Sequence, residues 1–89
     1  MPNVTITHSV SNMETWLAGG AERTGLFKTF STGYRIYRLA DKARVALVLE
    51  NVDMAKFGAV MKDAATAAAM EKHAVVQPVE VFVEIDGGR

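Results

Sequence analysis

The chain contains no cysteine, and this absence removes a broad set of chemistries. Without thiols there is no disulfide, no thiolate zinc site, no iron–sulfur cluster and no cysteine nucleophile. No segment approaches the roughly 18 consecutive apolar residues that a membrane-spanning helix needs. Residues 1–9 also lack the basic and apolar regions of a secretory signal. We therefore expect a cytoplasmic protein with no membrane partner.

An excess of charge is absent as well. Ten Lys and Arg residues balance ten Asp and Glu residues, so the formal net charge at pH 7 is zero. Binders of nucleic acid carry a basic surface, and we therefore expect no nucleic-acid partner. The sequence has no glycine-rich phosphate loop after a strand, no HExxH and no G-x-S-x-G motif. Its two histidines give no recognisable metal site, and nothing in the sequence indicates a cofactor.

What remains is the composition of an ordinary folded domain. Hydrophobic residues make up 49% of the 89-residue chain and charged residues 22%. Chains divide into several domains only at much greater lengths, and no linker, repeat or low-complexity run interrupts this one. We interpret residues 1–89 as a single domain.

Alternating or β-branched segments predict four strands. Residues 4–10 and 79–85 alternate with period two, and residues 34–39 and 44–50 are joined by a short polar turn at 40–43. The third of these strands is apolar on both faces, which is typical of a central strand. The second carries arginines and is expected at an edge.

A first helix is expected after the first strand. The sequence SNME at 11–14 spells a capping box, with Ser11 as the cap of a helix that carries Trp16 on its apolar face. The pair Gly19-Gly20 either lets this helix lie close to a sheet or ends it early, and Gly25 is a further stop signal. We expect residues 26–33 to form a loop that packs onto the core.

Two aspartates predict the caps of further helices. Asp53 precedes a run with helical apolar spacing, and Asp63 precedes the alanine-rich segment that ends near His73. Pro78 ends any helix before the last strand, and residues 87–89 form a loose tail.

The order strand, helix, two strands, helix pair, strand predicts an α+β, ferredoxin-like βαββαβ domain with a four-stranded antiparallel sheet. The first and third strands then lie in the middle of the sheet. Helices cover only one face of such a sheet, yet the third strand offers Val45, Leu47 and Leu49 to one side and Ala46 and Val48 to the other. We expect a second copy to cover this face and form a homodimer, unless the loop at 26–30 folds over it.

The segments 33–41 (GYRIYRLAD), 45–50 and 69–80 (AMEKHAVVQPVE) resemble the dimeric α/β-barrel superfamily, in which two ferredoxin-like protomers pack sheet to sheet. This resemblance covers nearly the whole chain. It implies a homodimer and a function among cofactor-free monooxygenases, polyketide cyclases, lactone isomerases, haem-degrading enzymes or members without known activity. The haem-degrading members use an Asn, Trp and His constellation, which this chain does not match because its single Trp is on the first helix.

Two histidines are the candidate catalytic residues. His8 is in phase with Ile6 and Val10, and a histidine on an apolar strand face is either an acid–base group or a packed residue with one satisfied ring nitrogen. His73 either faces His8 across a cavity or stabilises a helix C-terminus from the surface. A polyketide cyclase of the resembling superfamily also places histidines on its first strand and just before its last.

The aromatic residues and arginines form a second candidate group. Trp16, Tyr34 and Tyr37 are expected to line a pocket for a planar ligand, although a Trp at helical spacing also fits a plain core. Arg23, together with Arg35 and Arg38, would either grip a carboxylate or lie in solvent. We predict binding of, or cofactor-free chemistry on, a small aromatic or ketide-like molecule between sheet and helices. The alternative is a non-catalytic dimeric interaction module whose cavity is filled by its own side chains.

Overall fold

The computed structural model describes residues 1–85, so the predicted tail at 87–89 lies outside the described residues. Four strands and four helices follow one another along the chain. In order, they are β1 (Val4–Val10), α1 (Met13–Ala18), α2 (Gly20–Phe27), β2 (Gly33–Arg38), β3 (Arg44–Glu50), α3 (Met54–Lys62), α4 (Ala64–Lys72) and β4 (Val75–Val83).

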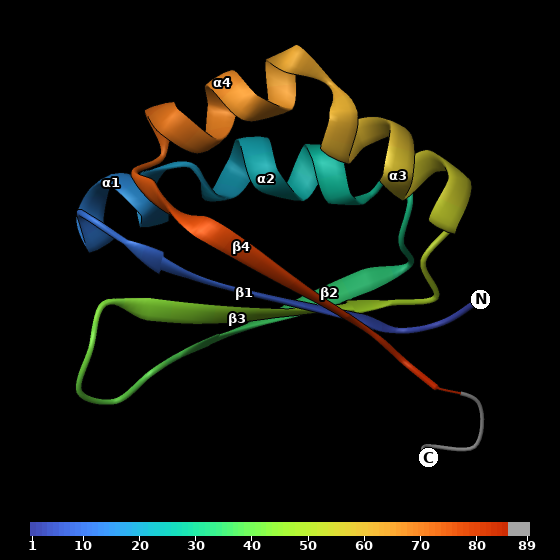
Figure 1. Cartoon of the computed structure of the whole chain (residues 1–89), viewed down its shortest axis with the longest axis horizontal. Helices are drawn as coiled ribbons and strands as arrows, with labels where there is room; N and C mark the ends of the chain where they lie inside the picture. Colours follow the sequence, from blue (N-terminus) through green and yellow to red (C-terminus); the bar gives the residue numbers. More distant parts are fainter. Residues whose placement is uncertain (86–89) are drawn as a thin grey trace.

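The strands form one antiparallel sheet in the order β2-β3-β1-β4. The two central strands are β1 and β3, as the sequence predicts. The four helices lie on the same side of the sheet, and no other element within residues 1–85 covers its other face (Figure 1). The predicted ferredoxin-like α+β fold is therefore confirmed.

The hydrophobic core lies between the helices and the sheet. Alternation along β1 directs Val4, Ile6, His8 and Val10 toward the helices, where all four are buried. Along β3, Val45, Leu47 and Leu49 likewise point toward the helices and are buried. The remaining core consists of Trp16, Phe27, Phe30, Val52 and Phe57. Since Phe27 and Phe30 are buried on the helix side, the segment at 26–30 does not fold over the other face of the sheet.

The first helical segment differs from its prediction at both ends. The cap of α1 is Asn12 and not Ser11, because the Asn12 side chain accepts a hydrogen bond from the Thr15 amide at 3.1 Å. The Ser11 amide instead donates to the Ala74 carbonyl at 2.9 Å. The helix is interrupted at Gly19, which agrees with the expectation that the glycine pair ends it early. It then continues as α2 through Gly25, whose predicted role as a stop is wrong.

The helix pair α3 and α4 follows its prediction. The side chain of Asp53 accepts hydrogen bonds from the amides of Ala55 and Lys56 at 3.1 and 3.2 Å. Asp63 accepts from the Ala65 amide at 3.0 Å, so that it separates the two helices and caps the second. These caps place α4 above α2, over the same side of the sheet (Figure 1).

The last strand begins earlier than predicted. Ala74 adopts a positive φ of 63°, and β4 then pairs with β1 from Val75 onward, opposite Val10. The register shifts between Thr7 and Ser9. Pro78 lies within the strand, where an edge position tolerates a residue without an amide proton. The expected start at residue 79 is therefore wrong, and the strand ends at Val83.

Candidate functional site

A cavity of about 280 Å³ lies between the helices and the sheet. Its wall is largely apolar, and its volume is just under the range that is typical of ligand pockets. The sheet contributes Ile6, Leu47, Val75 and Val79; the helices and the segment after α2 contribute Leu26, Phe27, Phe30, Phe57, Val60, Met61, Ala65, Ala69 and Met70. The polar lining residues are His8, Glu22, Arg23, Asp63, Thr66 and His73, and Trp16 completes the wall.

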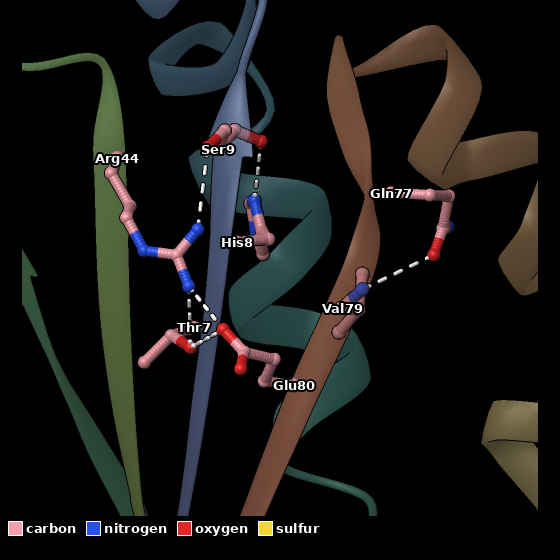
Figure 2. Close-up of polar contacts among 7 residues, drawn as sticks. All are labelled: Thr7, His8, Ser9, Arg44, Gln77, Val79 and Glu80. Atoms are coloured by element: carbon pink, nitrogen blue, oxygen red, sulfur yellow. Dashed lines mark hydrogen bonds and ion pairs between the residues drawn. The ribbon is translucent and has the colours of Figure 1, made fainter.

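His8 reaches this cavity from the centre of the sheet. Its side chain is on the helix side of β1 and only 5% of its surface is exposed. The ring nitrogen Nδ1 lies 3.0 Å from the Ser9 carbonyl oxygen, to which it donates as N–H, because a carbonyl only accepts (Figure 2). Within residues 1–85 the other nitrogen, Nε2, makes no hydrogen bond, although no fully buried polar side-chain atom is unpartnered. Nε2 is therefore open to the cavity.

The surroundings of His8 favour its neutral form. Burial lowers the pKa of His8 from its ordinary value of 6.5, and the positive charges of Arg23 and Arg44 lower it further. The hydrogen bond to the Ser9 carbonyl acts in the opposite direction and raises this pKa. At neutral pH, Nε2 therefore presents a lone pair to an apolar cavity.

Trp16 forms the wall beside His8. The two rings meet edge to face, with centroids 5.9 Å apart. The Trp16 side chain is buried in the core cluster, so the plain-core interpretation and the pocket interpretation both apply to the same ring.

Arg23 covers the face of Trp16. Its Cζ atom lies 3.8 Å from the centroid of the indole ring, and Nη2 donates to the Trp16 carbonyl oxygen at 2.6 Å. Only 8% of Arg23 is exposed, so the solvated alternative for this arginine is wrong. Arg35 and Arg38 are exposed on β2, away from the cavity wall.

His73 caps the C-terminus of α4 and also lines the cavity. Its Nε2 lies 3.0 Å from Glu22 Oε2 on α2, so the pair connects the two helices that flank the cavity. The ring packs on Gly19, where a Cβ atom would lie only 2.7 Å from ring atom Cε1. His73 thus ends a helix, but its side chain lines the cavity and does not lie at the surface as the second alternative stated.

The two tyrosines do not belong to the cavity wall. Tyr34 packs edge to face on Phe27, with centroids 5.0 Å apart, and its hydroxyl bonds the Thr24 hydroxyl. Tyr37 is on the opposite side of the sheet and 54% exposed, because it alternates with Tyr34 and Ile36 along β2. The prediction that both line a pocket with Trp16 is wrong.

Several wall residues were missed from the sequence. Glu22 and Thr66 look like ordinary solvent-facing helix residues, and Met70 is one more apolar residue in an alanine-rich segment. These residues line the cavity because α4 packs across α2, and no local sequence pattern predicts how two helices distant in sequence pack. Among residues 1–85 no group of three or more His, Asp or Glu side chains is arranged to hold a metal ion. No helix in the same part of the chain is long and apolar enough to cross a membrane.

The sheet face without helices carries a polar cluster at its centre. Figure 2 shows Arg44 reaching from β3 across β1 to form an ion pair with Glu80 on β4. The Arg44 guanidinium also donates to Thr7 Oγ1 at 3.1 Å and to Ser9 Oγ at 3.3 Å. This cluster joins three strands but lies on the face opposite the cavity.

Comparison with known proteins finds similarity in structure but not in sequence. No protein-family model matches the sequence, and no curated protein is significantly similar to it. A solved antibiotic biosynthesis monooxygenase superposes with a TM-score of 0.62 at 12% identity, over 96% of this chain and 97% of that chain. A protein from Nitrosomonas europaea, provisionally named an antibiotic biosynthesis monooxygenase, gives 0.63 at 15% identity, over 98% and 99%.

A third structure, from Deinococcus radiodurans and provisionally given the same name, gives a TM-score of 0.56 at 12% identity, over 98% of this chain and 93% of that chain. Each match spans nearly the whole of both chains, and the identities are so low that the likeness concerns the fold. The likeness supports the predicted ferredoxin-like α+β fold.

Proposed function

We propose that the chain binds a small aromatic or ketide-like molecule in the cavity and that His8 removes a proton from it without a cofactor. The observation that carries this proposal is the free Nε2 of a buried histidine at the wall of an apolar cavity. A neutral imidazole next to a desolvated ligand is suited to general base catalysis. The structural neighbours named as monooxygenases agree with a small-molecule role.

The proposed step is a simple proton transfer. A C–H bond next to a ligand carbonyl breaks, its electron pair stays on the ligand as an enolate, and the proton moves to Nε2. The Nδ1–H bond to the Ser9 carbonyl stabilises the resulting imidazolium. Return of the proton to another ligand atom, or reaction of the enolate with a carbonyl or with dioxygen, would follow. Isomerisation, cyclisation and cofactor-free oxygenation therefore share this first step.

We assign Trp16 and His73 to positioning. The Trp16 ring packs edge to face with His8, with centroids 5.9 Å apart, and carries Arg23 on one of its faces, so it holds both side chains at the cavity wall. His73 and Glu22 hold α4 against α2 and so maintain the shape of the cavity. Their loss is expected to weaken ligand binding more than it slows the proton transfer.

We further propose that the functional unit is a homodimer formed through the open sheet face. This face presents Val48 and Phe82, of which Phe82 is 56% exposed, around the Arg44–Glu80 pair. Apolar side chains of this kind on an uncovered sheet face favour association with a second copy. The cavity lies on the other side of the sheet, so each protomer would retain its own site.

Deuterium exchange tests the proposed chemistry without knowledge of the natural ligand. 2-Tetralone is a two-ring ketone with an acidic C–H next to its carbonyl, and NMR follows the loss of this proton in D₂O. We expect the protein to accelerate the exchange and His8→Gln to reduce the acceleration roughly 100- to 10,000-fold. Arg38→Gln, at an exposed position outside the cavity, is the matched control. Equal exchange with His8→Gln and the wild-type protein would disprove the role of His8.

A further inference from the structure

Arg23 is a buried cation at the wall of an apolar cavity, and it forms no ion pair within residues 1–85. Burial lowers the pKa of Arg23, and the nearby Tyr34 and Glu22 side chains raise it. The ion pairs in this part of the chain involve Arg44, Lys72 and His73. Arg23 instead has the indole face of Trp16 at 3.8 Å and one backbone carbonyl at 2.6 Å. A guanidinium has five N–H donors, so these contacts leave most of them free.

The two carboxylates of the cavity wall are engaged elsewhere. Glu22 is paired with His73 at 3.0 Å and lies 3.7 Å from Lys72. Asp63 caps α4 through the Ala65 amide, and its side chain is exposed. Neither carboxylate forms an ion pair with Arg23, and both residues are exposed whereas Arg23 is buried.

Arg23 and His8 line the same cavity. Both residues pack on Trp16: Arg23 lies over its ring face, and His8 meets the ring in a T-shaped contact. Within residues 1–85 no fully buried side-chain donor lacks a partner, so the Arg23 N–H groups that make no hydrogen bond are not sealed in the core. A buried charge is costly unless it is paired, and a ligand carboxylate would supply the missing partner by a bidentate contact.

We infer that the cavity is specific for planar molecules bearing a carboxylate, which Arg23 binds beside Trp16. This inference rests on the proposed function and narrows its ligand class. Stacking places the guanidinium over the indole face, so the acid group and the aromatic body of the ligand would lie along the same wall. The carboxylate would fix which ligand atom faces His8 Nε2.

A pair of isosteric probes tests this inference. 2-Naphthoate and 2-naphthamide share a two-ring shape and differ in charge, and the indole N–H signal of Trp16, the single Trp, reports their binding by NMR. We expect 2-naphthoate to bind at least tenfold more tightly. Arg23→Gln should weaken the naphthoate at least tenfold and change the amide less than about threefold, whereas Arg38→Gln should change neither.

A second readout is the pKa of His8. The charged groups that act on His8 are Arg23 from α2 and Arg44 from β3, and both lower its pKa. A carboxylate on Arg23 would offset that repulsion, so 2-naphthoate should raise the pKa of His8, measured by NMR titration, and 2-naphthamide should not. Arg23→Lys, which keeps the charge, should retain part of the preference for the naphthoate.

The outcomes separate this inference from the proposed function. Equal binding of the two probes, with no change in the pKa of His8, would overturn the carboxylate specificity and leave the cavity as a ligand site. Absence of binding by both probes, together with absence of 2-tetralone exchange, would overturn both. Exchange of 2-tetralone without a naphthoate preference would retain the His8 chemistry alone.

Discussion

His8 is the residue around which the proposed chemistry is arranged. Its Nδ1–H is fixed by the Ser9 carbonyl, which determines the tautomer and leaves Nε2 open to the cavity. Strand alternation alone predicted that His8 shares a side with Ile6 and Val10. It could not predict which side, because the pattern is the same whether helices or a partner sheet cover it. The packing of Trp16 and Arg23 around the imidazole settles this point in the structure.

The lowered pKa of His8 gives the protein a specific dependence on pH. The unfolded chain binds the proton near pH 6.5 and the folded chain binds it only at lower pH, so this group stabilises the fold above pH 6.5. That contribution is lost as the pH falls through 6.5 toward the folded pKa. Urea unfolding should show that the unfolding free energy of the wild-type protein is lower at pH 5.5 than at pH 7.5. The decrease should be smaller for His8→Gln. An identical decrease in both proteins would contradict a buried, neutral His8.

The same shift sets the pH profile of 2-tetralone exchange. Only the neutral imidazole accepts a proton, and its fraction rises with pH through the folded pKa. Because this pKa lies below 6.5, more than half of the imidazole is neutral at pH 6.5, and the catalysed exchange should there exceed half of its plateau rate. A rate that still rises steeply between pH 7 and pH 8 would indicate a different base.

At the scale of elements, the break between α1 and α2 allows the His73 ring to contact the Gly19 backbone. This contact brings the end of α4 to the start of α2, and the Glu22–His73 pair adds a polar link between them. The shape of the cavity therefore depends on how α2 and α4 pack on each other.

Alanine substitutions at the adjacent glycines test this contact. A Cβ at Gly19 would lie 2.7 Å from the His73 ring, whereas a Cβ at Gly20 would have no neighbour within 4 Å. We expect Gly19→Ala to cost about 1–3 kcal/mol in unfolding free energy through overpacking. Gly20→Ala should be neutral or stabilise α2 by up to about 1 kcal/mol. Equal thermal unfolding of the two variants would show that His73 does not pack there.

The wall formed by α4 offers a test of whether the cavity is a real binding space. Ala69 lines it, while the adjacent Ala68 is exposed and outside it. Ala69→Phe should fill the cavity and weaken 2-tetralone binding more than about tenfold, because the ligand and the new ring need the same volume. Ala68→Phe is the matched control and should bind as the wild-type protein does. Unchanged binding by Ala69→Phe would place the ligand elsewhere.

Local signals predicted some elements well and others poorly. β1 and β3 follow from alternation, and α3 and α4 from their aspartate caps, because these features depend on near neighbours in sequence. The end of α2 depends instead on Phe27, which packs on Phe30 and Tyr34 and extends the helix beyond Gly25. The early start of β4 likewise depends on pairing with the end of β1, which is distant in sequence.

At the scale of the whole molecule, the sheet separates two surfaces with different roles. One face is buried under the helices and carries the cavity, and the other presents Val48, Phe82 and the Arg44–Glu80 pair (Figure 2). The segment at 26–30 packs in the core and leaves this second face uncovered. The homodimer therefore remains a prediction, which rests on the apolar side chains of this open face.

Charge placed on the open face should separate the proposed dimer. Val48 is half-buried on β3, and Val48→Glu would introduce a carboxylate among apolar side chains at the dimer contact. We expect light scattering to give two 9.7 kDa chains for the wild-type protein and one for the variant. Ala68→Glu, on the helix side, should stay dimeric. A wild-type monomer, or a dimeric Val48→Glu, would contradict this interface.

Intermolecular nuclear Overhauser effects between 2-tetralone and the protein test the central claim most directly, because they locate the ligand. The account predicts contacts from the ligand to the rings of His8 and Trp16, and to the methyl group of Met70 on α4. Contacts to Tyr37 and Phe82 would place the ligand on the open sheet face and contradict it.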